Sequence, residues 1–323
     1  MVAVGDEDDW FDRALEDEDE DGDESPTTDE GEADGDDGAL FDDDFDTALR
    51  DVGPPVDADD DSDDPVGPAG FDDLDFVLGG DEPDFDAELD SDLPRLDLGI
   101  DGLDRMIQGG VPERSLIVVM GSAGTGKTTF GLQFLHHGLE HGERAVFITL
   151  EESRDRVISS ATEKGYAFDE YVADRQLAVV DVDPIEMANS LASIRNELPA
   201  LVEEFGASRL VLDSVSLLEM MYEDRAKRRN EIYDFARSLK DAGVTALLTS
   251  EAAAETAYAS RYGIVEYLTD AVMVLQYVRP DDFRETRMAV EIQKIRDANH
   301  SREKKPYEIT PDGISVHQQA NLF

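Results

Sequence analysis

Hydrophobic residues beyond position 92 fall in short runs separated by helical patterns. The runs are bounded by polar residues or glycine, which is typical of buried strands. They lie at residues 116–120, 145–150, 177–182, 210–213, 244–250 and 271–277. A helical pattern follows the first run up to about residue 141, and others cover residues 154–164, 184–204 and 228–242. This alternation predicts an α/β fold with a mainly parallel central sheet flanked by helices.

The pattern changes near the C-terminus. Apolar segments at residues 288–295 and 314–316 follow one another without a long helix between them. Parallel neighbours need a long crossover connection, whereas antiparallel strands need only a short one. We therefore expect antiparallel strands at this end of the sheet.

The start of the chain has a different composition. Residues 1–94 contain 40 Asp and Glu but only two basic residues, Arg13 and Arg50. Such a segment repels itself and buries too little apolar surface to offset the entropy of ordering. The sequence therefore predicts a disordered acidic tail over residues 1–92 and one folded domain over residues 93–323.

A short pattern recurs inside this acidic segment. Phe and Leu stand four residues apart at residues 11–15, 45–49 and 85–89, which is the spacing of one face of a helical turn. Acidic and hydrophobic residues mixed in this way are found in segments that fold on a protein partner. One interpretation is docking to an unknown protein, and the other is a tail that only solubilises.

The net charge of −50 indicates the environment in which the protein works. Residues 95–323 alone carry −12, and high salt screens such repulsion, so we interpret the composition as adaptation to a salt-rich cytoplasm. The alternative is an acidic tail on an ordinary acidic domain. The chain has no cysteine, no run of about 20 apolar residues and no basic, apolar leader. We expect a cytoplasmic protein that does not enter a membrane.

A phosphate-binding motif follows the first apolar run. Its pattern G-x-x-x-x-G-K-[ST] is formed by Gly121, Ser122, Ala123, Gly124, Thr125, Gly126, Lys127 and Thr128, and Thr129 extends it. Backbone N–H groups of such a loop and the following helix N-terminus bind phosphate oxygens. We expect ATP and Mg²⁺ as ligands, with Lys127 at the β- and γ-phosphates and Thr128 as a metal ligand.

Acidic residues end two other predicted strands. Asp213 closes the run 210–213, where P-loop enzymes carry an acid that binds Mg²⁺. Glu151 and Glu152 follow the run 145–150, where a carboxylate can orient and polarise the attacking water. The alternatives are a strand-end turn residue and a helix-start acid. Residues 249–251, Thr-Ser-Glu, end a further strand and either sense the γ-phosphate or cap the structure.

In this order and spacing, the motifs resemble the KaiC-type branch of the RecA-like ATPases over about residues 93–318. Besides the phosphate loop, the matching segments are 98–104, 109–112, 151–153, 213–214, 247–251, 294–296, His300 and 306–314. The resemblance implies ATP bound between subunits of a homo-oligomer, often a six-membered ring. It also implies that Lys294, Arg296 and His300 reach a neighbour's phosphates, with Arg296 assisting catalysis. Alternatively, this basic cluster bridges to acids of its own chain.

The resemblance leaves three functions to weigh. The leading one is a regulatory or signalling ATPase that hydrolyses ATP slowly. Autokinase members carry an adjacent Ser-Thr pair that residues 264–268, Ile-Val-Glu-Tyr-Leu, lack, which favours hydrolysis over self-phosphorylation. A DNA-recombination accessory is the second. The clearest basic cluster, residues 225–229, is either a contact for nucleic acid or a solvated helix start, and the net charge opposes nucleic acid. The third, a non-hydrolysing ATP-binding scaffold, conflicts with the retained acids at 151, 152 and 213.

Overall fold

The computed structural model describes residues 92–279 and 286–318. The predictions for the acidic segment, namely its disorder, its docking pattern and its role as a separate tail, concern residues that lie outside this part. The first strand described, β1 (Arg95–Leu96), pairs with β2 (Val111–Pro112) in a small antiparallel sheet.

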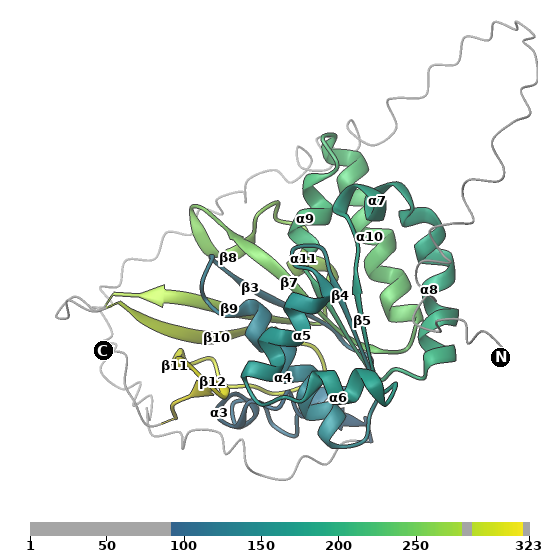
Figure 1. Cartoon of the computed structure of the whole chain (residues 1–323). Coiled ribbons are helices and arrows are strands. Elements are labelled where there is room, and N and C mark those ends of the chain that lie inside the picture. Colours follow the sequence, from purple (N-terminus) through teal and green to yellow (C-terminus); the bar gives the residue numbers. More distant parts are fainter. Residues whose placement is uncertain (1–91, 280–285, 319–323) are drawn as a thin grey trace, which may run out of the picture. The chain divides into compact units, whose positions relative to one another are not determined.

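A ten-stranded sheet forms the centre of the described structure (Figure 1). Its order is β12-β11-β10-β9-β3-β7-β6-β4-β5, with β8 paired to β7. The six strands from β9 to β5 run parallel, while β8, β10, β11 and β12 pair antiparallel. The strands are β3 (Leu116–Gly121), β4 (Ala145–Thr149), β5 (Leu177–Asp181), β6 (Arg209–Asp213), β7 (Thr245–Ala253), β8 (Thr256–Ser260), β9 (Ala271–Val278), β10 (Arg287–Ile295), β11 (Lys305–Thr310) and β12 (Gly313–Val316).

Helices cover both faces of this sheet. One face is packed by α3 (Asp101–Asp104), α4 (Lys127–Glu140), α5 (Arg154–Glu163) and α6 (Phe168–Ala173). The other is packed by α7 (Pro184–Asn189), α8 (Leu191–Phe205), α9 (Val215–Met220), α10 (Arg225–Asp241) and α11 (Val265–Leu268).

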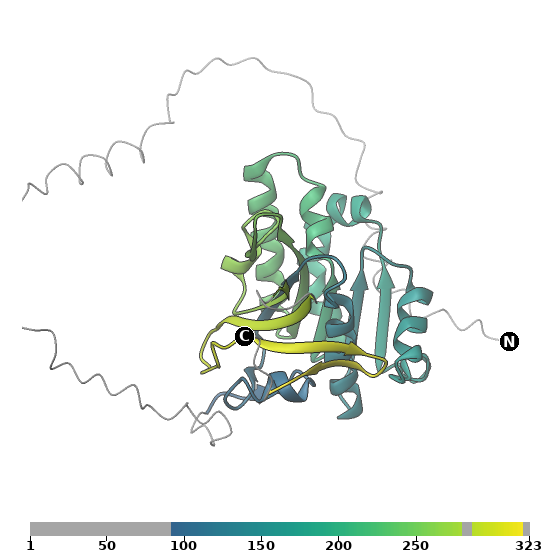
Figure 2. The same cartoon turned by 90° about the vertical axis from the view of Figure 1, so that its left-hand side faces the viewer.

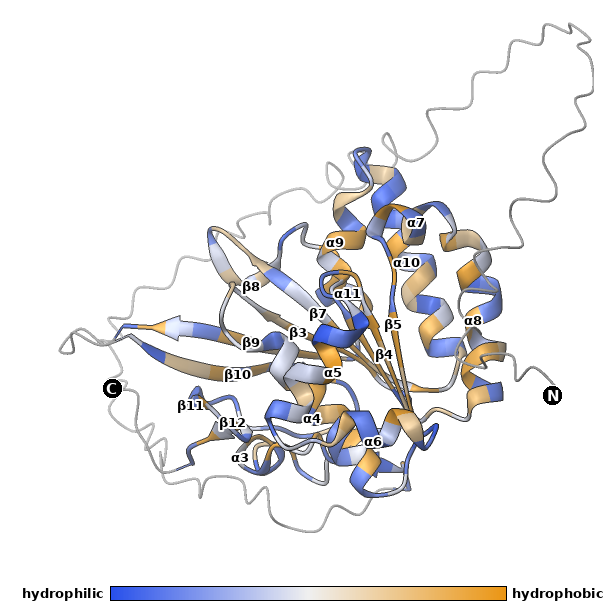
Figure 3. Ribbon diagram, viewed as in Figure 1, coloured by the Kyte–Doolittle hydropathy of each residue, from blue (hydrophilic) through white to orange (hydrophobic). Residues whose placement is uncertain are grey.

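Side-chain alternation along the strands explains the two-sided core. In β3, Ile117 and Val119 belong to the apolar cluster under α4, whereas Val118 and Met120 belong to the cluster under α8 and α10. Because both faces are covered, the parallel strands are almost continuously hydrophobic, and the helices alternate between apolar and polar stretches (Figure 3). Within the described ranges, no helix combines the length and the apolar character that crossing a bilayer requires.

The predicted fold class is confirmed, including the antiparallel strands at the C-terminal end, which are yellow in Figure 2. The helix expected at 184–204 is wrong as a single element. The carboxylate of Asp183 caps α7 by accepting from the N–H groups of Ile185 and Glu186, and Ser190 separates α7 from α8. The pattern also missed β8 and α6 and did not separate β11 as a strand, because short elements at the edge lack a clear period.

Candidate active site

The phosphate loop lies between β3 and α4, at the carboxyl edge of the parallel strands. Gly124 and Gly126 have φ angles of 81° and 89°, a region that favours glycine. A Cβ atom at Gly124 would lie 2.9 Å from the Tyr277 hydroxyl, and one at Gly126 would lie 2.8 Å from Cδ1 of Ile309. Both glycines are therefore favoured by backbone conformation, and a larger residue at either position would also have to displace an exposed side-chain tip.

Thr128 and Asp213 meet directly at this edge. The Thr128 hydroxyl donates to Oδ2 of Asp213 at 2.7 Å, and the Thr249 hydroxyl donates to Oδ1 at 2.5 Å. Asp213 is only 4% exposed, and each of its carboxylate oxygens accepts from one of these hydroxyls. The peptide from Asp213 to Ser214 is cis. The two predicted metal-binding residues are thus adjacent, although 85 residues separate them in the chain.

Lys127 lies over its own loop. Its Nζ atom donates to the carbonyls of Gly121 at 3.0 Å and Ser122 at 3.2 Å. These are exposed or half-buried contacts with neutral acceptors, which an anionic oxygen would replace with a gain in hydrogen-bond strength.

A residue of β11 supports the phosphate loop through a hydrogen bond. The Tyr307 hydroxyl donates to the carbonyl of Thr125 at 2.6 Å, and the Thr125 hydroxyl donates to the carbonyl of Ser122 at 2.8 Å. Burial raises the pKa of Tyr307, so the phenol stays protonated and able to donate. The sequence contains no motif that pairs Tyr307 with the loop, and this supporting residue was not predicted.

Glu151 and Glu152 are both exposed, but their carboxylates have different surroundings. The Thr149 hydroxyl oxygen accepts from the N–H of Glu152 at 2.9 Å and of Glu151 at 3.3 Å, which fixes the turn after β4. The Ser214 hydroxyl then donates to Oε1 of Glu151 at 2.7 Å. Because Ser214 directly follows Asp213, Glu151 lies beside the predicted metal ligand.

The end of β7 contributes polar groups to the same edge. Ser250 and Ser216 share a hydrogen bond of 3.1 Å between their hydroxyls, and Glu251 forms an ion pair with Arg261 at 2.9 Å. The Thr249–Asp213 and Ser250–Ser216 contacts connect β7 to the end of β6 and to α9, and the Glu251–Arg261 pair connects it to the residue after β8. Polar capping contacts are therefore present at residues 249–251.

Two of the three basic residues expected to reach a neighbour, Lys294 and Arg296, lie near the amino ends of the parallel strands, whereas the phosphate loop lies at the carboxyl ends. Lys294 is in register with Val272, near the start of β9, whereas the loop-side residue Gly121 pairs with Leu275. Within the chain, Nζ of Lys294 donates to the carbonyl of Glu266 at 2.8 Å, and Arg296 pairs with Asp270 at 3.4 Å.

The third of these residues, His300, contacts the carbonyl of Ser301 through Nδ1 at 2.9 Å. None of the three side chains reaches the phosphate loop of the same chain among these contacts. Within one chain, Arg296 is paired with an acid, Asp270, as the alternative interpretation of the basic cluster describes.

The loop and its neighbours fit a nucleotide phosphate with Mg²⁺. The glycine-lined cradle suits phosphate oxygens, and the Thr128 hydroxyl with the Asp213 carboxylate suits a hard cation that keeps waters and phosphate ligands. Among the described residues, no group of three or more His, Asp or Glu side chains is arranged to hold a metal by itself. A cation here would therefore depend on oxygens supplied by the nucleotide.

Comparison with known proteins agrees with this geometry. A family model described as "ATPase: KaiC" matches residues 96–321. The chain belongs to the KaiC ATPase family.

Two relatives of this KaiC-family chain are circadian clock oscillator proteins named KaiC. The one from Acaryochloris marina is 34% identical over 215 residues, covering 64% of this chain and 41% of that protein. The one from Prochlorococcus marinus is 34% identical over 214 residues, covering 64% of this chain and 42% of that protein. The chain thus spans about two fifths of the length of these relatives.

A solved structure shows the same core. The crystal structure of a KaiC-like protein from the hyperthermophilic archaeon Pyrococcus horikoshii OT3 has a TM-score of 0.62 and 34% sequence identity. The matched region covers 70% of this chain and 99% of the archaeal chain. The described part of the KaiC-family chain is therefore a RecA-like P-loop ATPase core.

Proposed function

We propose that this chain binds ATP with Mg²⁺ in its phosphate loop and hydrolyses the nucleotide. The observation that carries the proposal is the hydrogen bond between Thr128 and Asp213. The next residue, Ser214, donates a hydrogen bond to Glu151. A hydroxyl and a carboxylate for the metal, and a second carboxylate for water, then lie at one edge of the sheet. This arrangement supports catalysis better than passive nucleotide storage.

Each residue has a role that follows from its contacts. The backbone N–H groups at the start of α4 bind phosphate oxygens, and Lys127 exchanges the carbonyls of Gly121 and Ser122 for phosphate. Thr128 and Asp213 hold Mg²⁺, which when bound neutralises phosphate charge. Glu151 accepts the proton of the attacking water, because Ser214 orients its carboxylate.

Nucleotide binding is tested by Lys127→Ala. We expect the variant to lose most of its affinity for a fluorescent ATP analogue while its circular dichroism spectrum stays unchanged, because the ammonium that faces the phosphates is removed. Lys164→Ala is the matched control, since it removes the same charge at the end of α5. ATP binding by Lys127→Ala as tight as that of the parent would disprove the assignment of the site.

Hydrolysis is tested with the two adjacent glutamates. Glu151→Gln keeps the shape of the side chain and should slow turnover roughly 10²-fold with ATP still bound, the usual scale for losing acid–base assistance. Glu152→Gln is the control, because only the Glu151 carboxylate accepts from Ser214. Turnover that is insensitive to Glu151→Gln but falls with Glu152→Gln would transfer the role to Glu152. Insensitivity to both would leave the acids a structural role.

The assembled form is part of the proposal. Lys294 and Arg296 lie near the amino ends of the parallel strands, away from the phosphate loop of their own chain, so a nucleotide that they contact would belong to another subunit; His300 is proposed to act with them. This supports a homo-oligomer whose sites are shared between neighbours, working as a slow regulatory ATPase. We place the ATPase in residues 93–323 and favour hydrolysis over self-phosphorylation, because no adjacent Ser-Thr pair precedes Thr269.

A further inference from the structure

A pocket of about 260 Å³ lies beside the first turn of α10. Its lining includes Arg225 and Arg229 from α10, and Tyr262, Ile264, Tyr267 and Leu268 from the segment that contains α11. Helices α10 and α11 are in contact and are drawn close together in Figure 1. The residues of this pocket are separate from those of the phosphate loop.

The two arginines of the pocket are exposed and available. Within residues 92–279 and 286–318, neither the Arg225 nor the Arg229 side chain makes a hydrogen bond or an ion pair. They are four residues apart on one helix, so their charges face the same side and repel. The arginine between them behaves differently, because Nε of Arg228 donates to the carbonyl of Glu219 at 2.9 Å and its guanidinium lies 4.0 Å from the Tyr262 ring centroid. The two exposed guanidiniums are therefore free to bind an anion.

Nearby acids do not supply that anion. Glu219 is fully buried with no hydrogen-bond partner on either carboxylate oxygen among the described residues. Burial, then the charge of Glu266, raises the pKa of Glu219 to about 8, so it is mostly neutral at neutral pH. Glu266 accepts from the N–H and hydroxyl of Ser260, and Asp224 caps α10 by accepting from the N–H of Lys227. The pocket lining itself thus contains two arginines and no acidic residue.

The aromatic side of the pocket specifies the ligand further. Tyr267 is 75% exposed and lines the pocket beside Leu268, so the face of its ring is accessible. Flat bases stack on such rings, whereas the carboxylates of an acidic peptide gain nothing from them. A volume at the small end of ligand pockets favours one nucleotide unit over a folded partner.

We propose that this pocket binds a nucleotide unit, with a phosphate between Arg225 and Arg229 and the base against Tyr267. The unit comes either from a free mononucleotide or from a single strand. The net charge of the chain opposes broad attraction of nucleic acid, so recognition depends on these three side chains. The proposal does not depend on hydrolysis at the phosphate loop.

The test uses the full chain with Lys127→Ala in every sample, so that the phosphate loop binds neither the probe nor the competitor. Fluorescence anisotropy with a labelled oligothymidylate is measured over a range of KCl concentrations, and unlabelled thymidine monophosphate serves as competitor. We expect Arg225→Gln with Arg229→Gln to weaken binding at least about tenfold, because two charged hydrogen-bond donors are lost. The slope of log affinity against log salt should shrink by about 0.7 for each phosphate contact removed.

The aromatic contact is tested in the same assay. Tyr267→Ala should weaken binding at least about fivefold, the lower end for one stacked base. The matched controls are Arg237→Gln and Tyr233→Ala, which remove an exposed arginine and an exposed tyrosine from α10 away from the pocket. Neither control should change affinity.

The competition distinguishes the sources of the nucleotide. Displacement by thymidine monophosphate identifies a free mononucleotide, whereas binding of the strand alone, with the same variant pattern, identifies a single strand. Both outcomes support the proposal. It is overturned if neither labelled oligothymidylate nor labelled thymidine monophosphate binds, if the pocket variants bind as the parent does, or if polyglutamate displaces the strand as well as thymidine monophosphate does.

Discussion

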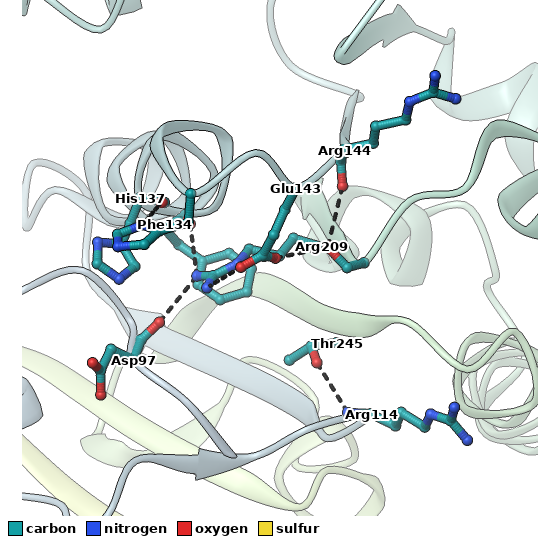
Figure 4. Close-up of polar contacts among 10 residues, drawn as sticks. Asp97, Arg114, Phe134, His137, Glu143, Arg144, Arg209 and Thr245 are labelled. Carbon is teal, nitrogen blue, oxygen red and sulfur yellow. Dashed lines mark hydrogen bonds and ion pairs between the residues drawn. The ribbon is translucent and has the colours of Figure 1, made fainter. Parts of the chain in front are cut away.

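Arg209 offers a sharp test of how the described fold is stabilised. It begins β6, is only 2% exposed, and donates through Nε and Nη2 to both carboxylate oxygens of Glu143 at 2.8 and 3.0 Å. Its Nη1 atom donates to the carbonyls of Asp97 and Phe134, each at 3.0 Å, and its guanidinium lies 4.8 Å from the Phe134 ring centroid (Figure 4). One side chain thus joins the segment before α3, helix α4 and the turn before β4 to the sheet.

Replacing Arg209 with Met keeps an unbranched apolar stem in place of the arginine methylene groups and removes every donor. Breaking a buried ion pair from one side costs about 3–5 kcal/mol, and each buried carbonyl left without a donor costs about 1–3 kcal/mol. Glu143 is 28% exposed and can turn to water, and the methionine still packs on Phe134, so both effects are reduced. We expect a loss of about 3 kcal/mol in the free energy of unfolding, or a fall of about 6–12 °C in melting temperature.

Urea denaturation followed by far-ultraviolet circular dichroism measures this loss. Arg144→Met is the matched control, because Arg144 lies in the exposed surface and donates to the carbonyl of Phe205, and its loss should cost under about 1 kcal/mol. Equal denaturation midpoints for the parent and Arg209→Met at neutral pH would refute the reasoning.

Acid provides an independent check on the same pair. Burial alone would raise the pKa of Glu143, but hydrogen bonds from Arg209 and Ser208 outweigh it and hold the pKa below the ordinary value of 4.5. The stabilisation from the pair is therefore present above that ordinary value and is lost as the pH falls through the lowered one. The stability difference between the parent and Arg209→Met should shrink in acid.

Three further predictions concern buried and site residues. Because the pKa of Glu219 is raised to about 8, parent stability should decline as the pH rises from about 4.5 to about 8, with a slope of at most about 1.4 kcal/mol per pH unit. Glu219→Gln should remove this part of the decline in urea titrations, and an unchanged slope would contradict it. Thr128→Ala should weaken ATP binding more with Mg²⁺ than with EDTA, and equal losses would exclude a metal role. Arg296→Ala subunits should recover activity when mixed with Glu151→Gln subunits, whereas no recovery in mixed assemblies would argue against shared sites.

The parts of the fold that are periodic in sequence could be predicted from it. The buried strands are continuous apolar runs, and the glycines of the phosphate loop are needed for local backbone reasons, so both are visible without tertiary information. Contacts such as Tyr307 with Thr125 join residues 182 positions apart and have no local pattern. The same is true of Thr249 with Asp213, because any polar residue at a strand end has the same appearance in sequence.

The paired glutamates illustrate what geometry adds to a motif. Glu151 and Glu152 are the same residue type at adjacent positions, and the sequence assigns the catalytic role to either. The Ser214 hydroxyl reaches only Glu151, and this contact depends on how the ends of β4 and β6 come together. The choice therefore requires the register of two strands that are separated by a long stretch of chain.

The order of strands in the sheet has a consequence for synthesis on the ribosome. Strand β3 is the first of the large sheet to emerge, yet its neighbours β7 and β9 begin only at Thr245 and Ala271. The apolar run from Leu116 to Met120 therefore remains unpaired while more than a hundred residues are translated. Strand pairs so distant along the chain form slowly, and until they form the apolar side chains and unpaired backbone groups of β3 can contact other chains. We expect nascent chains to need protection by chaperones until β9 leaves the exit tunnel.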